Sequence, residues 1–275
     1  MNSFSRSWDM IAQSFSVLRK DKKLVVFPIL SGLSALAIAA AYFIPMSRVG
    51  ILHAHARGEH LDPTVYAWFF LWYCTNYFVI ILFNCALAAC AQIRFSGGEP
   101  TLSDGMGKAA AKFPNILLWA IISATVGTIL RITEDRAESF GRIVSELLGV
   151  AWAALTYLIV PVLVFEEENV FSSIKRSGQL LRKTWGEEIA SSFGFGLPFL
   201  VLSIPGVMIA IFGIRYNPLA FPVAVLYFLI LAAVMSAVKG IFAVALYRYA
   251  TQGEAPAGFS KVMLNGAFVD VSERS

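Results

Sequence analysis

The sequence predicts an all-α polytopic bundle of about six transmembrane helices, forming a single membrane domain over residues 1–275. Of the 275 residues, 57% are hydrophobic and only 15% are charged, whereas about a quarter of the residues in a soluble globular protein are charged. The hydrophobic residues gather in long runs, and roughly 20 apolar residues suffice to cross the hydrocarbon core as a helix. Because water is a poor solvent for such a composition, the expected surroundings are lipid.

Six apolar runs are long enough to be spans. They are residues 24–46, 66–95, 114–130, 147–165, 189–214 and 219–249. The first run follows 22 largely polar residues and is too long for the apolar region of a signal peptide, so we interpret it as a retained span. The second opens with a cluster of aromatic side chains, which favour the interface between lipid and water.

Amphipathic interfacial helices are expected beside the spans, in residues 1–23, 102–113 and 170–186, with residues 250–275 as a tail. In the first of these, apolar residues recur at helical spacing beside basic ones, which is typical of a helix lying among headgroups. Each segment begins with an apolar residue followed by serine, whose hydroxyl can accept a hydrogen bond from a free backbone N–H. The pairs are Phe4-Ser5, Leu102-Ser103, Phe171-Ser172 and Phe259-Ser260. Each pair therefore predicts a helix start.

An internal repeat accompanies this pattern. Ile93-Arg94-Phe95 followed by Gly98-Glu99 resembles Tyr247-Arg248-Tyr249 followed by Gly253-Glu254, and each set ends a predicted hairpin. The sequence thus predicts three copies of an interfacial helix and a transmembrane hairpin, with a partial copy at the end.

The distribution of basic residues predicts the orientation. The segments on the side of the N-terminus hold 15 lysines and arginines, the opposite side holds six, and Lys239 lies within the sixth span. Since basic loops stay in the cytoplasm, both termini are expected there. The grouping of the lysines and arginines beside the apolar runs also argues against a nucleic-acid partner.

The first functional hypothesis is a non-enzymatic membrane scaffold or accessory subunit that contacts anionic headgroups through its interfacial helices. Each basic residue near an anionic surface contributes about 1 kcal/mol of attraction. The expected lipid contacts are Arg6, Trp8, Arg19, Lys20, Lys22, Lys23, Lys175, Arg176, Arg182, Lys183 and Trp185. Membrane lipids are the expected partners, together with a second copy of the chain or another membrane protein.

The alternative is a small-solute or ion transporter or channel that uses a kinked fifth helix and Lys239. An ionisable residue inside a span often marks a substrate or proton path, although the long lysine stem can instead reach toward the headgroups. Pro198 and Pro205 should kink or break the fifth span, and Asn76 and Asn84 could line a path or bond between helices.

No cofactor and no metal site are predicted. His53, His55 and His60 lie in the loop between the first two spans, but their spacing matches no standard zinc site. The acidic run of residues 166–168 is expected to pair with Lys175 or Arg176, or to cap the helix that follows. No catalytic motif is present, so an enzyme is not predicted.

Several stretches carry a family resemblance. They are Phe4-Ser5-Arg6-Ser7-Trp8 with Leu18-Arg19-Lys20-Asp21, Pro161-Val162-Leu163-Val164, Ser173-Ile174-Lys175-Arg176-Ser177 with Thr184-Trp185-Gly186-Glu187, and Leu246-Tyr247-Arg248-Tyr249-Ala250. In these residues nearly the whole chain resembles an uncharacterised family of bacterial six-span integral membrane proteins, which implies the bacterial plasma (inner) membrane. The chain is more distantly similar to the membrane domains of some glycerophosphodiesterases. Their catalytic domain is absent here, so their activity is not implied.

Overall fold

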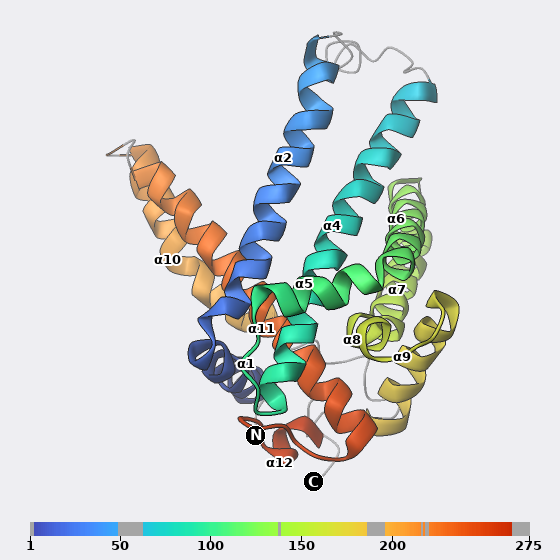
Figure 1. The fold of residues 1–275 in the computed structure, drawn as a ribbon. Helices are drawn as coiled ribbons and strands as arrows, with labels where there is room; N and C mark the ends of the chain where they lie inside the picture. The colour runs from blue at the N-terminus through green and yellow to red at the C-terminus, as the bar shows by residue number, and fades with distance from the viewer. Residues whose placement is uncertain are drawn as a thin grey trace.

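The computed structural model describes residues 3–48, 63–136, 139–185, 196–215, 217 and 220–265. These residues form helices, with no strand among them (Figure 1). The helices are α1 (Ser3–Lys20), the 3-10 helix η1 (Lys22–Val25), α2 (Val26–Arg48), α4 (Pro63–Phe95), α5 (Leu102–Ala111), α6 (Phe113–Arg136), α7 (Ser139–Leu155), α8 (Ile159–Phe165), α9 (Val170–Trp185), α10 (Gly196–Arg215), α11 (Ala220–Gln252) and α12 (Lys261–Asn265). The predicted all-helical fold is confirmed.

Five helical stretches are long and apolar enough to cross a membrane. They are Lys22–Met46, Thr64–Phe95, Phe113–Leu130, Leu147–Phe165 and Ala220–Gln252. The predicted fifth span corresponds to α10, whose apolar part, Pro198–Gly213, is shorter. Residues 189–195 of that prediction lie outside the described residues. Many large apolar side chains on these helices are exposed, including Leu36 at 61% and Met208 at 63%. Lipid is the solvent that such a surface requires.

The helices pack as the pairs α2 with α4, α6 with α7, and α10 with α11. In Figure 1 the connected ends of the three pairs spread apart toward the top, the upper left and the right, and α1, α9 and α12 lie toward the opposite, lower end, here called the basal end. Helix α4 contacts α2, α5, α6, α8 and α11, so it is the centre of the bundle.

Small residues allow the central helices to approach closely. Residues 85–91 of α4 are all at most 2% exposed, and four of the seven are alanine and two are cysteine. Helix α11 contacts α4. A Cβ atom added to Gly240 of α11 would lie 2.6 Å from Cδ2 of Leu87. Close backbone approach of this kind gains dispersion energy in lipid, where burial of apolar surface gains little.

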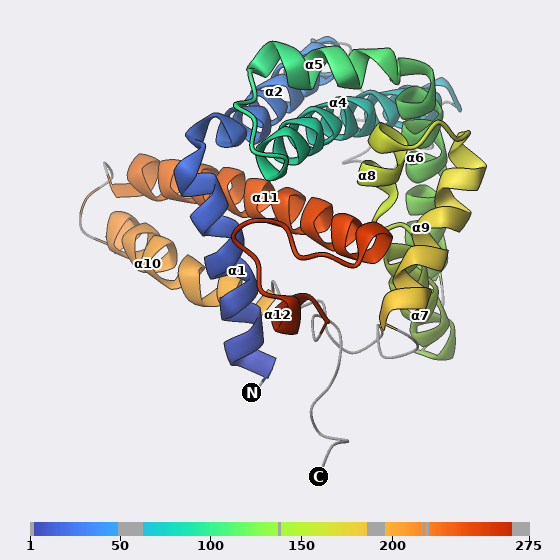
Figure 2. The same ribbon diagram turned by 60° about the horizontal axis from the view of Figure 1, so that its bottom comes forward.

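Three basal helices each bury one face. In α1, Met10, Ser14 and Val17 are buried while Arg19 and Lys20 are exposed. In α9, Ser173, Ser177, Leu180 and Leu181 are buried while Lys175, Arg182 and Lys183 are exposed. Helix α5 buries Gly105 and Ala109 and packs on α4, crossing the lower half of α4 in Figure 1 and lying beside it in Figure 2. These faces hold the basal helices against the ends of the apolar bundle.

The predicted fourth span, residues 147–165, matches the apolar stretch Leu147–Phe165, but a turn divides it into two helices. Helix α7 ends at Leu155, residues 156–158 form a turn, and α8 begins at Ile159. Pro161 explains the break, because proline has no N–H to donate to the carbonyl of residue 157 and its ring would clash there. The turn is stabilised by Ser177 of α9, whose hydroxyl accepts a 3.1 Å hydrogen bond from the backbone N–H of Leu158.

The prolines were predicted to kink or break the fifth span, and within the described residues that span is not broken. Helix α10 runs without interruption from Gly196 to Arg215. Pro198 lies in its first turn, where no intrahelical N–H bond is needed. Pro205 lies inside the helix, which continues past it. A proline therefore breaks the fourth predicted span but not the fifth.

The serine pairs mark the helix starts only approximately. Ser260 does cap α12, accepting a 3.2 Å hydrogen bond from the N–H of Met263. In α5 the cap is instead Thr101, which forms a capping box with Asp104. In α9 the cap is Asn169, whose side-chain oxygen accepts a 2.9 Å hydrogen bond from the N–H of Ser172. In both cases the residue that caps the helix precedes the apolar residue of the pair.

Candidate functional site

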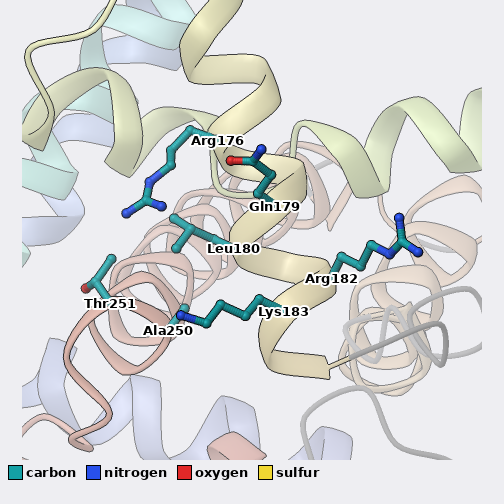
Figure 3. A pocket seen from close by; sticks show the side chains of 7 residues that line it. All are labelled: Arg176, Gln179, Leu180, Arg182, Lys183, Ala250 and Thr251. Carbon is teal, nitrogen blue, oxygen red and sulfur yellow. The ribbon is translucent and has the colours of Figure 1, made fainter.

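A basic pocket lies between α9 and the basal end of α11. It has a volume of about 550 Å³, and it is lined by Arg176, Gln179, Leu180, Arg182 and Lys183 of α9 with Ala250 and Thr251 of α11. Figure 3 shows Arg176 and Lys183 extending from α9 toward α11, whereas Arg182 extends the other way, at the rim. Arg176 and Lys183 thus extend toward a cavity large enough for a polar headgroup, and the guanidinium of Arg182 is directed away from α11.

An ion pair fixes one side of this pocket. The Nε of Arg176 donates to both carboxylate oxygens of Glu166, at 3.1 and 3.3 Å. The hydroxyl of Tyr247, a buried residue of α11, donates to Oε1 of the same carboxylate at 3.0 Å. The predicted pairing of the acidic run with Arg176 is confirmed. Glu166 neutralises only one of the three cations, and no carboxylate partner is recorded for Arg182 or Lys183 in the described part of the chain.

The rest of the acidic run serves packing between helices. Glu167 pairs with Lys112 at 2.8 Å, and Lys112 also donates to the backbone carbonyl of Glu166 at 3.0 Å. The side-chain amide of Asn115 donates to the carbonyl of Glu168 at 3.2 Å. These bonds join the start of α6 to the segment between α8 and α9.

The other predicted lipid contacts form a second basic group, at the end of α1 and in η1. Arg19, Lys20, Lys22 and Lys23 are exposed there, and Asp21 caps η1 by accepting a 3.2 Å hydrogen bond from the N–H of Lys23. Lys175 is exposed on α9 but does not line the basic pocket. The side chains of Arg6 and Trp185 lie outside the described residues. The predicted contacts are therefore divided between α1 and α9.

Trp8 lies against a different, apolar cavity. That cavity has a volume of about 460 Å³ and lies between α1, α10 and α11, where Trp8, Ile11 and Phe15 face Leu202 and Met235. Its wall is almost entirely apolar, which suits an acyl chain better than a headgroup. Trp8 therefore belongs to the apolar side of α1.

A third cavity, the Lys239 cavity, lies between the central helices. It has a volume of about 410 Å³ and is lined by Asn84 and Ala88 of α4, by residues of α7 and α8 and the turn between them, by Gly196, and by Ser236, Lys239, Gly240 and Ala243 of α11. Of the predicted transport path, it brings together Asn84 and Lys239. Asn76, Pro198 and Pro205 do not line it. The Nδ2 of Asn76 donates instead to the carbonyl of Trp72 at 3.1 Å.

No group of three or more histidine, cysteine, aspartate or glutamate residues that could hold a metal occurs among the residues placed in the structure. The three histidines of the predicted outer loop, His53, His55 and His60, lie outside those residues.

Several residues at or beside these pockets were not predicted from the sequence. Tyr247 and Thr251 belong to a helix far from α9 in sequence, so only the tertiary fold reveals that they meet it. The position of Ser236 could have been predicted from the sequence, because it precedes Lys239 by three residues and so lies on the same face of the helix.

These features define a helical membrane protein whose basal helices carry clustered basic side chains. The chain belongs to the Family of unknown function (DUF6159), whose family model matches residues 64–259, well over half of the chain. No curated protein and no solved structure matches it.

Proposed function

We propose that the protein is a non-enzymatic scaffold or accessory subunit of the bacterial plasma (inner) membrane that binds anionic lipid headgroups through its basal helices. In this proposal the membrane is crossed six times. The 20 residues of α10 extend about 30 Å as a helix, which matches the hydrocarbon thickness. The three helix pairs then form three hairpins, each preceded by an amphipathic helix, α1, α5 or α9, with α12 as a partial fourth copy.

The orientation in this proposal places both termini and the basal end in the cytoplasm. Its support is the excess of lysine and arginine in the segments that precede and follow the hairpins. The same excess places the basic groups of α1 and α9 beside the inner leaflet, whose anionic lipids attract them.

The observation that carries the proposal is the basic pocket. Arg176 and Lys183 extend into the space between α9 and α11, and Arg182 stands at the rim (Figure 3). A phosphate group binds well to such a cluster, since charge-assisted hydrogen bonds to phosphate are the stronger kind. Glu166 holds Arg176 in place before a lipid arrives, which lowers the entropy cost of binding.

Native mass spectrometry of the full-length protein in a neutral detergent tests this proposal. Wild type should retain more phosphatidylglycerol than phosphatidylcholine when the two are supplied equally. The double variant Arg182→Gln/Lys183→Gln should lose most of that preference. The variant Lys108→Gln removes an exposed lysine of α5, outside the pocket, and should keep it. An unchanged preference in the double variant would contradict the proposal.

A second candidate function is the transport of a small solute or ion past Lys239. It is favoured by the cavity that joins Lys239 to Asn84. In proteoliposomes containing a pH-sensitive dye, wild type should then give a faster proton or anion leak than Lys239→Ala. Equal leak rates for the two proteins would argue against transport.

A further inference from the structure

The Lys239 cavity holds polar side chains at the depth of the apolar spans. Lys239 lies nine residues before Arg248, so it is about 13 Å farther along α11 from the basal end. Asn84, Ser236 and Lys239 all line the cavity, whose volume of about 410 Å³ is in the range of small-molecule sites. Lys239 is exposed, and Asn84 and Ser236 are half-buried. Polar groups that face hydrocarbon are costly unless a partner satisfies them.

These side chains differ from other polar groups in the spans. The hydroxyls of Thr75 and Thr125 each donate to the carbonyl four residues earlier, both at 2.8 Å, and Asn76 does the same with its amide. No such bond is recorded for Asn84, Ser236 or Lys239 within the described part of the structure. Their donors are therefore available to a bound molecule.

The charge of the cavity selects the ligand. Lys239 supplies a cation, the side chain of Asn84 supplies an N–H₂ donor, and no carboxylate is among the described residues that line the cavity. The remaining wall is mainly apolar, with Ala88, Ala153, Val160 and Ala243 among its residues. The complementary molecule has an anionic oxygen group and an apolar chain.

We infer that the Lys239 cavity binds an anionic amphiphile, an alkyl chain that ends in a carboxylate or a phosphate ester. The anionic group accepts hydrogen bonds from Lys239 and Asn84, and the chain lies along the small apolar residues of α7, α8 and α11. This site goes beyond the proposed headgroup binding. Ser236, Lys239 and Ala243 lie on a stripe of α11 that continues at helical spacing through Tyr247 to Ala250 of the basic pocket.

Isothermal titration calorimetry on the full-length protein in dodecyl maltoside tests the inference with four soluble probes of equal chain length. Octanoate and octyl phosphate should bind, and octanol and octyltrimethylammonium should bind at least tenfold more weakly. A preference between the two anions identifies a fatty carboxylate or a phosphate ester as the source. If the cation binds as tightly as the anions, the inference is wrong.

Four variants complete the test. Lys239→Gln should weaken anion binding at least tenfold, while Lys239→Arg should stay within about threefold of wild type. Asn84→Asp adds a carboxylate to the same wall and should also weaken anion binding. This variant keeps the test decisive if Lys239→Gln folds poorly. Arg182→Gln/Lys183→Gln should leave octyl anion binding unchanged, so failure here is separate from failure of the headgroup proposal. Anion binding that survives both Lys239→Gln and Asn84→Asp overturns the inference.

Discussion

The guanidinium of Arg176 and the carboxylate of Glu166 form an ion pair, with Nε and Oε2 3.1 Å apart, that joins the end of α8 to α9. The Glu166 side chain is only 17% exposed, whereas that of Arg176 is 39% exposed. Tyr247 brings α11 to the same carboxylate. A single acidic side chain thus connects the end of α8 to α9 and α11, the two helices that line the basic pocket.

Glu166→Gln should destabilise the protein by about 1–3 kcal/mol, because partly buried donors on Arg176 and Tyr247 lose a charged acceptor. Glu167→Gln is the matched control. Glu167 also forms an ion pair, with Lys112, but its side chain is 93% exposed, so its loss should cost about 0–1 kcal/mol. Denaturant unfolding in detergent measures both. Equal effects of the two substitutions would show that Glu166 is not the connecting residue.

Gly105→Ala should destabilise the packing of α5 on α4 by about 1–3 kcal/mol. The added Cβ would lie 2.7 Å from the backbone carbonyl oxygen of Ala86, which cannot move as a flexible side chain could. In Gly107→Ala, on the same helix, the new Cβ meets nothing within 4 Å. That control should be neutral, or stabilising by up to about 1 kcal/mol through helix propensity. The midpoint of thermal unfolding distinguishes the two, and a tolerated Gly105→Ala would refute this packing.

Thr101→Ala should lower stability by about 1 kcal/mol through loss of the cap of α5. The Thr101 hydroxyl accepts a 3.2 Å hydrogen bond from the N–H of Asp104, and the Asp104 carboxylate accepts a 2.9 Å bond from the N–H of Thr101. Ser103→Ala, at the residue just before Asp104, removes a side chain that takes no part in the box, and this control should have a smaller effect. Hydrogen exchange of the first α5 amides reports the loss directly.

The same box predicts a pH dependence. Hydrogen bonds from the side chain and backbone of Thr101 lower the pKa of Asp104 below its usual value. A group whose pKa is lower in the folded state stabilises the protein above the unfolded pKa, and this contribution is lost as pH falls through the folded pKa. Wild type should therefore lose more stability than Asp104→Asn between neutral pH and about pH 3. Identical pH profiles of the unfolding midpoint would contradict the prediction.

The proposed orientation makes a labelling prediction. Ser103→Cys lies on α5 and Asn217→Cys lies between α10 and α11, and both positions are exposed. In intact cells a membrane-impermeant maleimide should label Asn217→Cys and should label Ser103→Cys only after permeabilisation. Wild type, in which Cys85 and Cys90 are buried, gives the background. Labelling of Ser103→Cys in intact cells would invert the topology.

Composition and local pattern predict the helical membrane class because apolar length alone decides which segments need lipid. Finer features depend on single residues. Pro161 interrupts the fourth span while Pro205 does not interrupt α10, since surrounding helices decide whether a lost N–H bond is tolerated. Thr101 and Asn169, the actual caps, lie just before the pairs that the sequence suggested.

The sequence predicts which residues of one helix share a face at each candidate site, but not which second helix packs beside them. Arg176 and Lys183 are seven residues apart, so their shared face on α9 follows from helical spacing. The packing of that face beside Thr251 comes from tertiary contacts between distant segments. The same holds for Asn84 and Lys239, which lie on α4 and α11 and meet only because small residues let these helices cross closely.

The most direct test of headgroup binding at the basic pocket is thermal unfolding in nanodiscs of two compositions, one zwitterionic and one containing phosphatidylglycerol. Anionic lipid should raise the unfolding temperature of wild type, and Arg182→Gln/Lys183→Gln should lose most of that increase while unfolding normally in the zwitterionic discs. An equal increase in wild type and the double variant would contradict lipid binding at this pocket.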